Sequence, residues 1–93
     1  MVTFVKNKKI VISNKLGLHA RAAAKFVRIA SGFQSEIMIH FGSHKVSGKS
    51  IMGIMMLAAG KGTEISLVTV GPDEDEAITA LENLIINIFG EAE

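Results

Sequence analysis

Apolar and polar residues alternate along several stretches of the chain, which is the pattern of strands in a sheet with one covered face. The alternating stretches are residues 2–12, 35–41 and 63–70. A Gly-Ser turn at residues 42–43 and a short return strand at 44–47 follow the second stretch, so we expect a hairpin there. The residues expected on the covered face are Ile10, Ile12, Ile37, Ile39, Phe41, Ile65, Leu67 and Thr69.

Three other stretches repeat apolar residues every three to four positions, which is the period of a helix with one buried face. The first is 19–31, where the apolar stripe is followed by Gly32 as a C-terminal cap. The second is 51–57. The third begins at the acidic residues 73–76, whose charge suits the positive end of a helix, and ends at Gly90. The tail after Gly90 reads as frayed.

The order of these elements is β-α-β-β-α-β-α. It predicts an α+β fold, a two-layer open-faced sandwich in which a four-stranded, mostly antiparallel sheet carries three helices on one face. A chain of 93 residues makes a single domain, 1–93, with one modest core.

Composition narrows the function classes. The net charge of +1 and the lack of Trp and Tyr argue against nucleic-acid binding. Without cysteine there is no disulfide or thiolate metal site. The start of the chain does not resemble a signal peptide, and the longest weakly polar stretch, 51–60, is too short to span a bilayer, so we expect no membrane insertion. The 48% hydrophobic content is high, which suggests that some apolar surface contacts a protein partner.

The stretch Gly-Leu-His-Ala-Arg at residues 17–21 carries the candidate chemistry. Gly17 marks a turn, and His19 falls at the N-cap of the first helix, where free N–H groups and the helix dipole attract anions. Arg21 adds a planar cation that suits phosphate oxygens. A nucleophilic imidazole in this place is suited to carrying a phosphoryl group. The same two residues also fit an ordinary solvated helix start, and other motifs have to decide between these interpretations.

His40 and His44 lie on or beside the hairpin, but no third ligand is evident near them. We therefore expect neither a metal nor another cofactor. The glycines Gly48 and Gly53 fit neither a dinucleotide fingerprint nor a P-loop.

Taken with a second motif at residues 48–55, the stretch 17–21 makes the whole chain resemble the HPr family, the histidine-containing phosphocarriers of the phosphoenolpyruvate:sugar phosphotransferase system. Residues 17–21 match the family's active-site motif. Residues 48–55, Gly-Lys-Ser-Ile-Met-Gly-Ile-Met, match its second motif around a regulatory serine. The order of elements and the separation of the two motifs also agree.

The resemblance implies that His19 accepts a phosphoryl group on Nδ1 from enzyme I, which is charged by phosphoenolpyruvate. The group then passes to IIA domains of sugar permeases or of a regulatory branch, and Arg21 stabilises the phosphate. Ser50 becomes a regulatory site wherever a dedicated serine kinase and phosphorylase exist, with transcriptional regulators as further partners. The protein is then a cytoplasmic phosphoryl carrier rather than a stand-alone enzyme. We expect a monomer, because a carrier needs its docking face free.

One position departs from the family pattern, which usually has proline after the active-site arginine. Here the residue is Ala22. Alanine is a strong helix former, so we expect the helix to survive, although the loop–helix junction loses the fixed φ of proline. This departure also fits a paralogue of another branch, such as the nitrogen-related one.

A docking surface is expected around both motifs. Arg21, Lys25 and Arg28 follow one helix face at i, i+4 and i+7, and Lys49 adds a fourth cation. On spacing alone this stripe fits an ordinary solvated face; the resemblance favours docking of acidic partners. In the second motif we expect Ile54 and Leu57 in the core. The residues expected to remain on the surface as an adaptable apolar patch are Ile51, Met52 and Met55.

Three functions remain open on the sequence. The first is a phosphocarrier acting through His19. The second is a regulatory binding protein of the same fold that acts through Ser50 phosphorylation. The third ignores the resemblance and is a small module that binds an anionic ligand at the His19 helix end.

Overall fold

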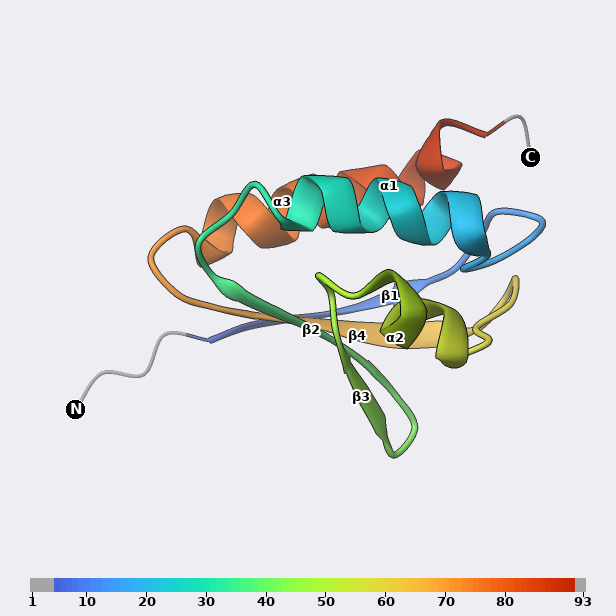
Figure 1. Ribbon diagram of the computed structural model, residues 1–93, viewed down its shortest axis with the longest axis horizontal. Coiled ribbons are helices and arrows are strands. Elements are labelled where there is room, and N and C mark those ends of the chain that lie inside the picture. The colour runs from blue at the N-terminus through green and yellow to red at the C-terminus, as the bar shows by residue number, and fades with distance from the viewer. Residues whose placement is uncertain (1–4, 92–93) are drawn as a thin grey trace.

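The computed structural model describes residues 5–91 and contains the predicted elements in the predicted order (Figure 1). A sheet and a layer of helices enclose one core. The elements are β1 (Lys6–Val11), α1 (Ala20–Ala30), β2 (Glu36–Phe41), β3 (His44–Ser47), α2 (Ile51–Met56), β4 (Glu64–Val70), α3 (Glu74–Ile86) and the 3-10 turn η1 (Ile88–Gly90).

Within the described residues, four strands form one sheet in the order β1-β4-β2-β3, and every neighbouring pair is antiparallel. Register places Ile10 opposite Ile65 and Ile39 opposite Leu67, so that the apolar residues of three strands share one face. The long helices α1 and α3 lie side by side across this face (Figure 1). The predicted two-layer open-faced sandwich is confirmed.

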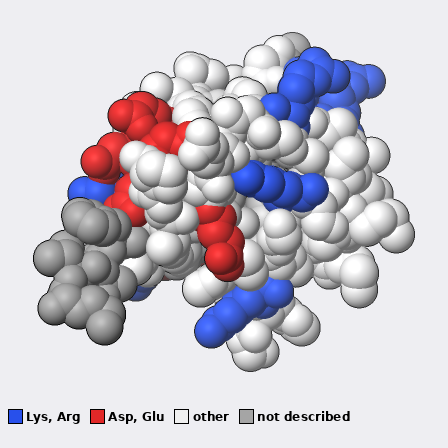
Figure 2. Space-filling view, turned by 60° about the vertical axis from the view of Figure 1, so that its left-hand side comes forward, with Lys and Arg blue, Asp and Glu red and all other residues white. Residues whose placement is uncertain are grey.

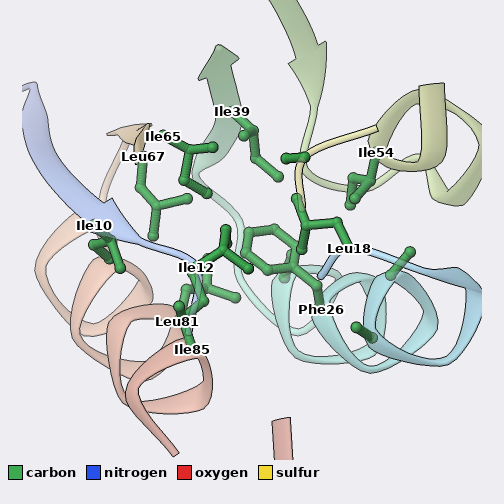
Figure 3. Close-up of a cluster of buried hydrophobic side chains, with 14 of the residues drawn as sticks. Ile10, Ile12, Leu18, Phe26, Ile39, Ile54, Ile65, Leu67, Leu81 and Ile85 are labelled. Atoms are coloured by element: carbon green, nitrogen blue, oxygen red, sulfur yellow. The ribbon is translucent and has the colours of Figure 1, made fainter. Parts of the chain in front are cut away.

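The core lies between the sheet and the helices, where the period-two and helical apolar stripes meet. Phe26 of α1 and Leu81 of α3 are fully buried, and Figure 3 shows their side chains reaching toward those of the strands. Ile54 and Leu57 join this core, as expected for the inner side of α2. Burying a large apolar side chain contributes about 1.5–3 kcal/mol, so this layer supplies most of the driving force for folding.

Two element ends differ from the sequence prediction. Strand β1 begins at Lys6, and the predicted positions 2–4 lie outside the described residues. Helix α1 ends with Ser31 as its C-cap, and Gly32 does not have the positive φ of a glycine cap. Instead, the Gly32 N–H bonds the Ile29 carbonyl oxygen at 3.1 Å, and this tighter turn satisfies a free carbonyl at the helix end.

The prediction that the last helix runs to Gly90 was also wrong. Helix α3 ends at Ile86, and Ile88 and Phe89 adopt left-handed φ values of 49° and 57° before Gly90 at 73°. The apolar period alone could not show this reversal. It turns Phe89 into the core, where the side chain is 1% exposed. Each left-handed residue other than glycine costs about 1–2 kcal/mol, which burial of the aromatic ring offsets.

A carboxylate joins the two loops at the end of the sandwich where α3 begins. Asp73 accepts the backbone N–H groups of Gln34 and Ser35, both at 2.9 Å, and also the Ser35 hydroxyl. The Ser35 hydroxyl bond, followed by the Gln34 N–H bond, lowers the pKa of Asp73 below its usual value.

This pairing predicts an acid-sensitive contribution to stability. The folded-state pKa of Asp73 is depressed, so its stabilisation is fully present above the unfolded value of 3.8 and is lost as pH falls through the lower folded value. In Asp73→Asn we expect a lower melting temperature at pH 7, with the difference from the native chain shrinking toward pH 2. Thermal unfolding at several pH values measures it. A constant difference across this range would contradict the assignment.

Among residues 5–91, no helix has the length and apolar character needed to cross a membrane.

Candidate functional site

His19 is the N-cap of α1, as predicted. Its backbone is extended, and its carbonyl oxygen accepts the N–H of Ala23 at 2.8 Å. The imidazole Nδ1 accepts the N–H of Arg21 at 3.3 Å. The ring therefore fills the role that a serine or aspartate oxygen usually has at an N-cap. One quarter of the His19 side chain is exposed, and Nδ1 lies at the positive end of the helix, where anions bind.

The loop before His19 is held firmly. Gly17 has a φ of +68°, and an added Cβ there would lie 2.5 Å from the Ala59 carbonyl oxygen. Leu18 is buried in the core (Figure 3), and its N–H donates to that same oxygen at 2.9 Å. The turn at Gly17 and the anchor at Leu18 thus position the histidine at the helix start.

Helix α1 itself adds no negative charge at this end. Residues 20–23, its first turn, include no acidic side chain, and Arg21 is exposed there. The first turn of α3, in contrast, carries Glu74, Asp75 and Glu76. Figure 2 brings the end of the molecule where α3 begins toward the viewer, and most of the acidic side chains on that face gather in one part of it. The positive end of α1 is therefore left without a nearby acidic residue of its own helix.

The C-terminal segment closes over the histidine, where the sequence predicted a frayed tail. For Glu91 this prediction was wrong; positions 92–93 lie outside the described residues. The Glu91 carboxylate oxygens Oε2 and Oε1 lie 3.0 and 3.1 Å from Nε2 of His19. Figure 1 shows η1 above the start of α1. The left-handed turn at residues 88–90 directs Glu91 to this position.

Two further side chains hold this segment, and the sequence analysis had not linked either of them to the C-terminus. Asn14, fully buried, donates from Nδ2 to the Gly17 carbonyl oxygen at 2.8 Å and to Glu91 Oε1 at 2.9 Å. Lys25 donates from Nζ to the Phe89 carbonyl oxygen at 2.6 Å. We call Phe89–Glu91, with these contacts to Asn14, His19 and Lys25, the C-terminal clasp. The apolar pattern gave no signal for it, since each partner is a polar residue distant in sequence.

The clasp carboxylate is ionised at neutral pH. Burial raises the pKa of Glu91, but the hydrogen bond and electrostatic attraction of His19, with smaller contributions from Asn14 and Lys25, outweigh burial and lower it below its usual value.

The predicted docking cations differ in their surroundings. Arg21 and Arg28 are exposed on α1. Lys25 is half-buried in the clasp, and Lys49, though exposed, donates from Nζ to the Phe33 carbonyl oxygen at 2.7 Å. The two arginines are therefore the cations of this set that present their charge most openly.

Ser50 is the N-cap of α2, as the sequence predicted, and its hydroxyl oxygen accepts the Gly53 N–H at 3.0 Å. The expected apolar surface lies next to it. One exposed residue of α2 that the sequence analysis had not assigned to this surface also belongs to it, Met56. The side chains of this apolar patch, with their exposed fractions, are Ile51 (41%), Met52 (71%), Met55 (40%) and Met56 (79%).

His40 and His44 lie on neighbouring strands, where Phe41 rather than His40 faces His44. In the part of the chain that the structure describes, no group of three or more His, Cys, Asp or Glu side chains has a metal-binding arrangement.

The departure at Ala22 leaves the helix intact. Ala22 is the third residue of α1 and is fully buried, and the helix begins at Ala20 without proline. The His19 N-cap and its Arg21 bond are formed all the same.

Comparison with known proteins agrees with this geometry. The family model "PTS HPr component phosphorylation site" matches residues 6–87. The phosphocarrier protein HPr of Neisseria meningitidis is 57% identical over 86 residues, which cover 92% of this chain and 97% of that protein. A crystal structure of HPr-C-His from Thermoanaerobacter tengcongensis superposes with a TM-score of 0.91 at 50% identity, covering 95% of this chain and 99% of the other. An HPr dimer from the same organism gives a TM-score of 0.75 at 52% identity, covering 88% and 94%. With a matching family model, half-identical relatives and the same fold, the chain belongs to the HPr family of phosphocarriers of the phosphotransferase system.

Proposed function

We propose that Nδ1 of His19 accepts a phosphoryl group from phosphorylated enzyme I, charged by phosphoenolpyruvate, and passes it to IIA domains of sugar permeases or of a regulatory branch. The observation that carries this proposal is the imidazole at the N-cap of α1, with Nδ1 aimed at the Arg21 N–H. Membership of the HPr family supports it.

The helix end suits both stages of such a transfer. Phosphoryl transfer asks the protein mainly for position and for stabilisation of charge. Before transfer, Nδ1 accepts the Arg21 N–H, so this nitrogen carries no hydrogen and its lone pair is the nucleophile. After transfer, the same N–H and the guanidinium of Arg21 are available to phosphate oxygens. No metal takes part in this proposal.

Incubation with enzyme I from the same organism and phosphoenolpyruvate tests it. Mass spectrometry maps the phosphate, and its acid and alkali stability identifies the bond. An acid-labile, alkali-stable phosphate on His19 is the expected result. A protein that stays unlabelled, or that carries the phosphate on another residue, would refute the proposal.

We propose further that partners dock on the surface between the two motifs. The exposed arginines Arg21 and Arg28, together with Lys25 and Lys49, would attract acidic partners and give fast, salt-sensitive association. The apolar patch, which includes Ile51, Met52 and Met55, would then contact the partner. Its methionines are flexible and so suit several different partners. We propose finally that the protein works in the cytoplasm as a monomer. Sedimentation in an analytical ultracentrifuge at working concentration tests the monomeric state.

Ser50 is the proposed regulatory position, because a charge placed there directly follows Lys49 in the chain and begins the helix that carries the apolar patch. Ser50→Asp should slow phosphoryl transfer from enzyme I by about tenfold, since a new negative charge opposes an acidic partner. The fold should persist, because aspartate is as good an N-cap as serine. Ser43→Asp, in the exposed hairpin turn, makes the same charge change as a control. Equal transfer rates for the Ser50 and Ser43 variants would sink the proposal.

A regulatory binding role through Ser50 phosphorylation is the second candidate. It is favoured by the half-buried Ser50 N-cap beside an exposed apolar patch, where a serine kinase or a transcriptional regulator could dock. The carrier role and the regulatory binding role are compatible, and only the carrier role needs His19. Either is also compatible with service in a nitrogen-related branch.

A further inference from the structure

The hydrogen bonds around His19 determine which ring nitrogen carries the proton. The ionised Glu91 carboxylate has no hydrogen to donate, so the contacts of 3.0 and 3.1 Å to Nε2 require a hydrogen on Nε2. On the other side of the ring, the Arg21 N–H points at Nδ1, which must then be an acceptor. Two independent contacts thus select the same tautomer, with the proton on Nε2 and the lone pair on Nδ1.

The carboxylate that makes this selection is itself held in place. The Glu91 side chain is 10% exposed, and Oε1 also accepts the Asn14 amide at 2.9 Å. Both hydrogens of Asn14 Nδ2 serve acceptors, so the orientation of its amide group is fixed as well. Lys25 fixes the backbone two residues earlier, at Phe89. Of the charged groups among residues 5–91, Glu91 alone contacts the ring by its side chain, while Arg21 contacts it by its backbone and Lys25 contacts the clasp.

We propose that Glu91 is a positioning residue for phosphoryl transfer: its carboxylate holds the proton on Nε2 of His19, which keeps Nδ1 as the nucleophile, and it balances the charge of the ring once Nδ1 is phosphorylated. This inference rests on the proposed function, in which His19 is the phosphoryl acceptor. A carboxylate that orients a histidine in this way is common where an imidazole works as a base or a ligand.

The step balances without a proton leaving the ring. The Nδ1 lone pair forms the new N–P bond, the bond between phosphorus and the donor's leaving atom breaks, and its electron pair stays on that atom. Nε2 keeps its hydrogen, so the accepting ring gains positive charge, and the Glu91 carboxylate lies 3.0 Å from it. In the next transfer the N–P electrons return to Nδ1, and the ring regains the starting tautomer.

Nitrogen-15 NMR of the unphosphorylated protein tests the tautomer directly. We expect the native ring to show protonated Nε2 and unprotonated Nδ1 at a pH where the ring is neutral. Glu91→Ala should shift this toward a mixture of tautomers, and Glu91→Gln, whose amide oxygen still accepts, should lie between the two. Glu76→Gln, which removes the same charge from an exposed position on α3, should leave the signals unchanged. A native tautomer in Glu91→Ala would overturn the proposal.

Reaction with potassium phosphoramidate, a small phosphoryl donor, measures the chemical consequence without any docking partner. Phosphorus-31 NMR reports the rate and the nitrogen that is phosphorylated. We expect Glu91→Ala to react about ten- to a hundredfold more slowly at Nδ1, the range known for carboxylates that orient metal-binding histidines, with a larger share at Nε2. An unchanged rate and site would show that Glu91 serves only to fix the C-terminus.

The two measurements separate this inference from the proposed function. If enzyme I fails to phosphorylate His19 while Glu91→Ala still changes the tautomer and the phosphoramidate reaction, the carrier proposal fails and the positioning of the ring stands. If enzyme I labels His19 equally well in the native chain and in Glu91→Ala, with an unchanged tautomer, the reverse holds.

Discussion

His19→Ala is expected to reduce phosphorylation by enzyme I and phosphoenolpyruvate below detection. The substitution removes the nucleophilic nitrogen, and no neighbouring side chain in the described residues replaces it at the start of α1. The fold should persist, because losing an N-cap acceptor costs about 1 kcal/mol against a typical stability of about 5–15 kcal/mol. Labelling with radioactive phosphoenolpyruvate, beside circular dichroism to check folding, measures the effect.

His44→Ala is the matched control, since His44 is an exposed histidine on β3. It should be labelled at the native rate. The His19 variant also separates the three functions that the sequence left open. It abolishes a carrier function, spares a regulatory function that depends on Ser50, and only weakens anion binding at the helix end. Undiminished labelling of His19→Ala would remove the carrier proposal.

Gly17→Ala is expected to destabilise the protein by about 2–5 kcal/mol and to displace the histidine loop. An alanine there would be held at a φ of +68°, with its Cβ 2.5 Å from the Ala59 carbonyl oxygen and 2.7 Å from Gly60 Cα. Both contacts are with backbone, which cannot move aside as a flexible side chain can. The left-handed conformation costs about 1–2 kcal/mol, and forced contacts in a packed region cost about 1–3 kcal/mol more.

Gly42→Ala separates these two costs. Gly42 has a similar φ of +60°, but an added Cβ there would meet nothing within 4 Å. Its loss of stability should therefore be limited to the conformational cost of about 1–2 kcal/mol. Denaturant unfolding measures both variants, and the rate of His19 phosphorylation should fall in Gly17→Ala alone. Equal destabilisation of the two variants would mean that the loop moves away from Ala59 easily.

Much of the fold could be predicted from the sequence because its elements depend on local pattern. Ile37 and Ile39 are buried while their chain neighbours are not, which matches the period of a strand, and the stripe through Phe26 matches that of a helix. His19 and Ser50 were predicted as N-caps from their places before apolar helical stretches, and both accept the expected backbone N–H groups. The ends of elements were harder, because the cap at Ser31 depends on which carbonyls the next loop can satisfy.

The sequence by itself determined the strand and helix stripes, the order of layers and the histidine at a helix start, because each depends on residues close together in the chain. Only the tertiary structure decided that Glu91, 72 residues from His19, reaches its Nε2. That contact requires the left-handed turn at residues 88–90, the burial of Phe89, and the hydrogen bond from Asn14, whose positions follow from packing rather than from any local period. A polar contact between distant segments has no repeating pattern, and for this reason the clasp became visible only once the core had brought its parts together.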